Sequence, residues 1–172
     1  LSLHDTLPIF DSKGAKEVIE TTFALTGNHV GYELNFIEMD FSEGLHRVFE
    51  GKRCTVDAFP ILHSVPTYGF RITEVLRSSN SSPVLGELPA GRRGSSPRVY
   101  TYCCDTAYSE DLVPFMRDSS LLCLECTFAD DLADLARERQ HLTASQAAHL
   151  ATLAEPKQLM LTHISARYKE PE

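Results

Sequence analysis

The sequence predicts an α/β domain. From residue 98 onward, short apolar runs typical of strands alternate with segments of helical periodicity. A capping-box pattern, Thr143-Ala-Ser-Gln146, marks the start of one of these helices. The 172-residue length is sufficient for one domain with a hydrophobic core, and the sequence contains no internal repeat.

The first part of the chain contains one predicted helix and three predicted strands. Residues 12–26 have apolar side chains at helical spacing, with Ser12 as the candidate N-cap and Gly27 as the candidate C-cap. The strands are expected at residues 33–39, 54–62 and 68–72.

The second part of the chain contains the alternating elements. Strands are expected at residues 99–104, 120–124 and 158–163, and helices at residues 109–116, 130–139 and 143–153. Pro156 ends the last helix, and the apolar run Leu159-Met-Leu161 that follows it predicts a buried strand.

Residues 74–98 have the composition of a loop, with Ser, Gly and Pro clusters around a short apolar piece at residues 84–88. They are the most basic part of an acidic chain because they contain four arginines: Arg77, Arg92, Arg93 and Arg98. Two interpretations stay open, a solvated loop or an arm that meets a polyanion.

Composition limits the function classes. The chain is 42% hydrophobic and has no apolar run of membrane-spanning length or secretion signal, so we expect a soluble, cytoplasmic protein without a membrane partner. The net charge of -8 argues against a general nucleic-acid binder but permits a nuclease with a local basic patch. Five cysteines, an odd number, favour reduced thiols. Residues 1–8 resemble a translated adapter sequence and are expected to be non-native.

Three candidate metal ligands follow apolar runs at predicted strand ends: His63, Asp105 and His163. Two imidazoles and a carboxylate far apart in sequence suit a zinc site that the fold assembles. If Asp105 bridged two ions, they would lie about 3.5–4 Å apart, as in two-metal hydrolases, and would lower the pKa of a bound water to about 7.

Glu125 and His141 are candidate catalytic residues. Glu125 follows an apolar strand, where an unpaired carboxylate is costly, so it requires a partner, and His141 is a suitable one. The pair could deliver a proton to a leaving alkoxide, or could be a structural hydrogen bond.

Several motifs together resemble ribonuclease Z, the tRNA 3′-end-processing endonuclease of the metallo-β-lactamase fold. They are Tyr102-Cys-Cys-Asp-Thr106, Glu125-Cys-Thr-Phe128, His141-Leu-Thr-Ala-Ser-Gln146 and Thr162-His-Ile-Ser-Ala-Arg-Tyr168. Phe59-Pro-Ile-Leu-His63 resembles the segment that carries another metal histidine of this family.

The resemblance implies an αβ/βα sandwich. It also implies that His63 and His163 each bind one zinc ion, that Asp105 bridges both, and that Glu125 and His141 assist proton transfer to the leaving 3′ oxygen. Residues 74–98 match the position of the family's tRNA-gripping arm, so substrate contacts are expected from Arg92, Arg93 and Arg167. A homodimer that binds pre-tRNA is expected.

The sequence departs from the family pattern because it contains no His-x-His-x-Asp-His motif. Residues 9–172 are therefore expected to form a partial metallo-β-lactamase-like domain that binds zinc weakly and does not cleave RNA. Two alternatives stay open: a phosphodiesterase or arylsulfatase-like hydrolase of small substrates with the same fold, and a non-catalytic remnant.

Overall fold

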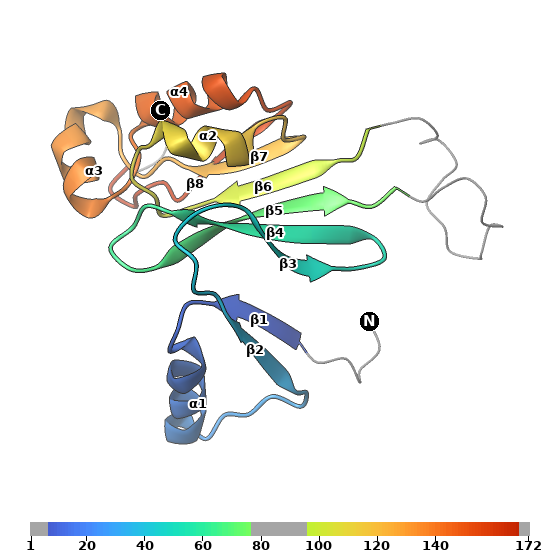
Figure 1. Cartoon of the computed structure of the whole chain (residues 1–172). Helices are drawn as coiled ribbons and strands as arrows, with labels where there is room; N and C mark the ends of the chain where they lie inside the picture. The colour runs from blue at the N-terminus through green and yellow to red at the C-terminus, as the bar shows by residue number, and fades with distance from the viewer. Residues whose placement is uncertain (1–6, 77–95, 169–172) are drawn as a thin grey trace.

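The computed structural model describes residues 7–76 and 96–168. Its first unit is a β–α–β arrangement, in which β1 (Leu7–Asp11) and β2 (Leu34–Glu38) pair in parallel and α1 (Ala15–Thr26) connects them. This two-stranded sheet and its helix lie below the larger sheet in Figure 1.

The larger sheet has six strands, and their spatial order is the same as their order in the sequence. The strands are β3 (His46–Glu50), β4 (Cys54–Ile61), β5 (Thr67–Glu74), β6 (Val99–Cys103), β7 (Leu121–Glu125) and β8 (Leu159–Thr162).

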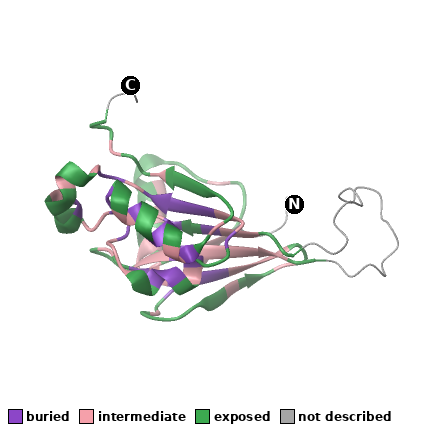
Figure 2. Cartoon of the chain, turned by 90° about the horizontal axis from the view of Figure 1, so that it is seen from above, coloured by how far each residue is buried: buried purple, intermediate pink, exposed green. Residues whose placement is uncertain are grey.

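Strands β3 to β6 are antiparallel, whereas β6, β7 and β8 are parallel. Parallel neighbours require crossover connections. The first contains α2 (Val113–Met116), and the second contains α3 (Ala133–Arg139) and α4 (Ala144–Ala154). The predicted α/β layering is therefore confirmed, since α2 and α4 contact each other over one face of the sheet (Figures 1 and 2).

The hydrophobic core lies between the central strands and the helices α2 and α4. Buried residues concentrate in these strands and on the inner side of the helices (Figure 2). The largest core side chains are Phe59, Met116, Leu122, Leu124, Leu142 and Leu150. Side chains of β6 and β7 belong to this core, and the candidate site residues Asp105 and Glu125 lie at the carboxyl ends of these strands.

Most predicted helices and strands are present, although several begin at a different residue from the one predicted. The helix α1 begins after Gly14 rather than at Ser12, because Ser12 bonds to Asp11 instead of capping the helix. Gly27 is the left-handed C-cap that was predicted. The predicted capping box of α4 is also confirmed, since Thr143 accepts from the Gln146 backbone and the Gln146 side chain accepts from Thr143.

The prediction of a buried strand at residues 158–163 is wrong in one respect. The strand β8 exists, but among the described strands it lies at the edge of the sheet and pairs with β7 alone. Its three apolar side chains are each about 40% exposed, because the helix α4 packs over β7 and does not reach the edge. An apolar run alone cannot distinguish a central strand from an edge strand.

Two short strands, β1 and β3, were not predicted from the sequence. The predicted piece at residues 84–88, most of the arm at residues 74–98, and residues 1–6 lie outside the described residues. None of the helices that the structure describes is both long and apolar enough to span a bilayer.

Candidate metal centre

Polar side chains converge where the three parallel strands end. Asp105 follows β6, Glu125 ends β7 and His163 follows β8. The carboxyl ends of neighbouring parallel strands meet at one edge, where open α/β sheets place their sites. One donor atom from each of these residues and one from His141 all lie within 4.8 Å of one another.

The side chain of Glu125 organises this cluster. It is fully buried and accepts hydrogen bonds from the backbone N–H of Thr106 (2.6 Å) and of Leu142 (3.0 Å). It also accepts from the Thr127 hydroxyl (2.7 Å) and contacts Nδ1 of His141 (2.9 Å). A carboxylate has about four acceptor positions, and these bonds use all of them. Glu125 therefore positions its neighbours rather than binding a cation, and His141 is the partner that the sequence predicted.

The protonation of His163 follows from these bonds. Its Nδ1 lies 2.9 Å from the Thr127 hydroxyl and 3.1 Å from Oδ1 of Asp105. Because Thr127 uses its only hydrogen toward Glu125, it must accept from His163. Nδ1 of His163 is then protonated, which leaves Nε2 with the lone pair that metal ligation requires.

A third imidazole, that of His63, comes from the loop after β4. Its ring centroid lies 5.4 Å from that of His141, which lies 5.1 Å from that of His163. Nδ1 of His63 is buried and has no hydrogen-bond partner in the part of the chain that the structure describes. An unpaired buried nitrogen is costly, so it indicates a missing partner. A metal cation is one partner that an imidazole nitrogen can bind.

Backbone hydrogen bonds lock the loops that carry the candidate ligands. Asp105 has φ 55° and His163 has φ 57°, both in the left-handed region that Asp and His enter more readily than most residues. The amide of Ala107 donates to the carbonyl of Leu62 at 2.7 Å, which ties the Asp105 loop to the His63 loop.

The thiol of Cys104 lies beside the cluster and donates to Oδ1 of Asp105 at 3.3 Å. Burial raises the pKa of Cys104 to about 11, and a hydrogen bond with Cys104 raises the pKa of Tyr102 to about 12. Both groups are therefore neutral at pH 7, and Cys104 is not a reactive thiolate there.

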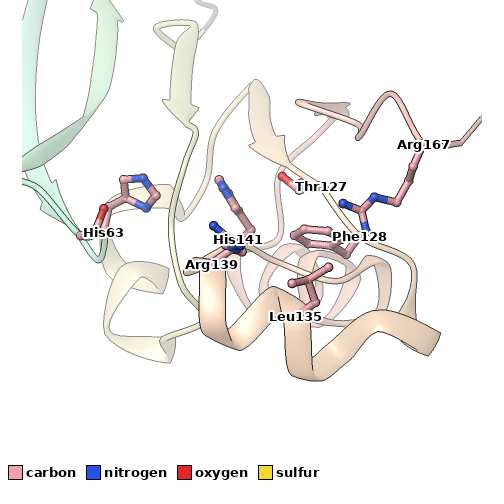
Figure 3. A pocket seen from close by; sticks show the side chains of 8 residues that line it. His63, Thr127, Phe128, Leu135, Arg139, His141 and Arg167 are labelled. Atoms are coloured by element: carbon pink, nitrogen blue, oxygen red, sulfur yellow. The ribbon is translucent and has the colours of Figure 1, made fainter.

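A cavity of about 420 Å³ opens beside the cluster. It is lined on one side by His63 and His141, and the remaining wall includes Phe128, Arg139 and Arg167 (Figure 3). The predicted substrate residue Arg167 thus lies at the cavity, with its guanidinium 4.9 Å above the centre of the Phe128 ring. Arg92 and Arg93 lie outside the described residues.

Comparison with known proteins agrees with this architecture. The family model described as "Beta-lactamase superfamily domain" matches residues 2–164. The chain belongs to this superfamily. The predicted metallo-β-lactamase fold is therefore confirmed, and the chain contains only part of it relative to its longer relatives.

The sequence of this chain is similar to those of curated ribonucleases Z. It is 32% identical to Ribonuclease Z of Lactiplantibacillus plantarum, over 95% of this chain and 61% of that protein. It is 33% identical to Ribonuclease Z of Bacillus subtilis, over 96% of this chain and 62% of that protein. The chain thus spans about three-fifths of the length of these relatives.

Solved structures show the same fold. The human tRNase Z, short form, superposes with a TM-score of 0.70 at 23% identity and covers 95% of this chain and 62% of that chain. A long form RNase Z from yeast superposes with a TM-score of 0.72 at 14% identity and covers 99% of this chain and 25% of that chain.

Proposed function

We propose that this superfamily member is part of a zinc-dependent endoribonuclease that matures the 3′ end of pre-tRNA. Two findings support the proposal: the similarity to curated ribonucleases Z over 95% of the chain, and the convergence of carboxylates and imidazoles at one sheet edge. The convergence is the decisive observation, because residues far apart in sequence meet beside a cavity that could admit a substrate.

His63, Asp105 and His163 would hold the metal, and their oxygen and nitrogen donors suit zinc. A bound zinc ion would supply Lewis acidity and lower the pKa of a coordinated water. The tautomer of His163 is set for ligation by the hydrogen bond from its Nδ1 to Thr127. The Asp105 carboxylate is the candidate bridge between two ions.

Glu125 and His141 would move a proton. The Glu125 carboxylate receives Nδ1–H of His141 and stabilises a positive charge on the ring. Nε2 of His141 can then hold a proton and release it to the leaving 3′ oxygen of the tRNA. The buried position of Glu125 keeps the ring orientation fixed during this step.

Arg167, at the cavity, and Arg92 and Arg93, in the 74–98 arm, would bind the RNA. We also propose that the enzyme is a homodimer and that it acts in the cytoplasm. Because the printed sequence contains no His-x-His-x-Asp-His motif, we also propose that these residues alone bind zinc weakly and do not cleave RNA. Isothermal titration that finds two tightly bound zinc ions per chain would refute this last point.

The test of the proposed function is cleavage by the product of the whole gene. With zinc, it should cut a pre-tRNA once after the discriminator base, and Asp105→Asn should reduce the rate by at least about a hundredfold. Hydrolysis of bis(p-nitrophenyl) phosphate without cleavage of pre-tRNA would instead support a small-substrate hydrolase. A folded protein that hydrolyses neither compound would support a non-catalytic remnant.

A further inference from the structure

The cavity beside the metal centre has two guanidinium groups from separate elements. Arg139 is the last residue of α3, and Arg167 follows β8 in the C-terminal turn. In Figure 3 they lie on either side of the Phe128 ring. The proposed function assigns a role to Arg167, but it does not use Arg139.

The charge of the cavity wall is opposite to that of the chain as a whole. The chain carries 24 acidic and 16 basic side chains. The wall contains Arg139 and Arg167 but no aspartate or glutamate among the described residues that line it. A concave surface of one charge sign attracts ligands of the opposite sign, so this cavity favours an anion.

The guanidinium of Arg139 is available to such an anion. Within the described residues, it pairs with the carboxylate of Glu138, 3.6 Å away, and both side chains are about two-thirds exposed. An exposed ion pair of this length is weak. In contrast, Arg137 on the same helix does not line the cavity, and it pairs with Asp134 at 3.3 Å.

The cavity also offers an apolar surface between its two cations. The Phe128 ring and Leu135 line it, and the guanidinium of Arg167 lies over the Phe128 ring. Aromatic rings and guanidinium planes are the surfaces on which single-stranded RNA bases stack, and arginine forks bind phosphate oxygens in pairs. This combination suits one nucleotide of an RNA strand.

We infer that Arg139 is a substrate-positioning residue that binds the phosphate of a nucleotide next to the scissile bond. The inference rests on the proposed function and adds a specific contact to it. Arg139 would fix the register of the strand beside His141, which lines the same cavity. It would contribute no chemistry to bond cleavage.

The test measures RNA binding without metal, so that it is independent of catalysis. Fluorescence anisotropy of a labelled single-stranded RNA hexamer, in EDTA and at several salt concentrations, gives the affinity and its salt dependence. Arg139→Gln should weaken binding about fivefold to tenfold. The plot of the logarithm of the association constant against the logarithm of the salt concentration should become less steep by about 0.7. Arg137→Gln, which removes the same charge from the same helix, should change the affinity less than twofold.

Arg139→Lys should recover part of the affinity and the full salt slope, because lysine keeps the charge but not the fork. Equal weakening by Arg139→Gln and Arg137→Gln, with normal binding by the unsubstituted chain, would overturn the inference and leave the proposed function intact. Absence of any RNA binding by the unsubstituted chain would also overturn the inference, whereas the proposed function is decided by cleavage with the product of the whole gene.

Discussion

The hydroxyl of Thr127 lies 2.9 Å from Nδ1 of His163 and orients the imidazole ring. Because the same hydroxyl donates to the buried Glu125, the carboxylate sets the tautomer of a histidine that it does not touch. Residues that hydrogen-bond to a metal ligand without binding the metal themselves often control metal affinity.

Replacement of Thr127 by valine should therefore weaken metal binding. Valine has the same shape but no hydroxyl, so Nδ1 of His163 would lose one of its two acceptors and keep only Asp105, which would hold the ring less firmly. We expect the affinity for zinc, measured by competition with a chromogenic chelator, to fall about 10- to 100-fold. Thr127→Ser, which keeps the hydroxyl, should stay within about threefold of the unsubstituted chain, and equal loss in both variants would contradict this account.

Glu125→Gln should reduce stability even without metal. Each carboxylate oxygen of Glu125 accepts one backbone N–H, that of Thr106 at Oε1 and that of Leu142 at Oε2. The NH2 group of Gln would face one of these donors in either orientation, so at least one buried donor would lose its acceptor. We expect a loss of about 3 kcal/mol in the free energy of unfolding, measured by urea denaturation. Glu138→Gln, at an exposed position of α3, is the control and should change it by less than about 0.5 kcal/mol.

Gly69→Ala should destabilise the sheet through overpacking. Gly69 is paired with Phe59 across β4 and β5, and a Cβ atom there would lie 2.4 Å from Cζ of that buried ring. The ring is enclosed by the core and cannot move away freely, so we expect a cost of about 1–3 kcal/mol in thermal or urea unfolding. Gly31→Ala, where a Cβ atom would meet nothing within 4 Å, should be close to neutral.

Asp130, in the short turn before α3, bonds to Ser145 of α4 and should make stability depend on pH. Hydrogen bonds from the hydroxyls of Thr143 and Ser145 and from the Ser145 amide lower the pKa of Asp130 below its usual 3.8. Its stabilising effect is therefore complete above pH 3.8 and is lost as the pH falls through the lower, folded-state pKa.

Asp130→Asn should accordingly lower the urea midpoint at pH 7 and at pH 5, and the difference should shrink at pH 3 and below. The neighbouring Asp131→Asn serves as the control, because the side chain of Asp131 makes no hydrogen bond among the described residues. A difference that stayed constant between pH 7 and pH 2 would show that the Asp130 charge is not responsible.

Local sequence patterns predicted most of the fold. Helical periodicity located α1 and α4, and the capping box of Thr143 was correct because it depends only on residues three positions apart. The burial of β8 was predicted wrongly, because burial depends on which element packs on a strand, and a strand's own residues do not contain that information.

The candidate site was predictable where a residue follows a strand. Asp105 and His163 were expected to meet, and their side chains lie 3.1 Å apart. The ring of His63 lies beside that of His141, and the role of all three residues as ligands stays a prediction. The positioning role of Thr127 and the cavity position of Arg139 were missed. No sequence pattern near Thr127 or Arg139 indicates these roles, because each role depends on a contact between segments that are distant in the sequence.

The left-handed backbone at Asp105 and His163 has a thermodynamic consequence. A short free peptide would rarely hold either residue at these angles, because the sheet and its hydrogen-bonded loops enforce them. Occupancy of the centre is therefore coupled to the folding equilibrium. Any ion that binds there must raise the melting temperature, and a chelator that removes the ion must lower it again.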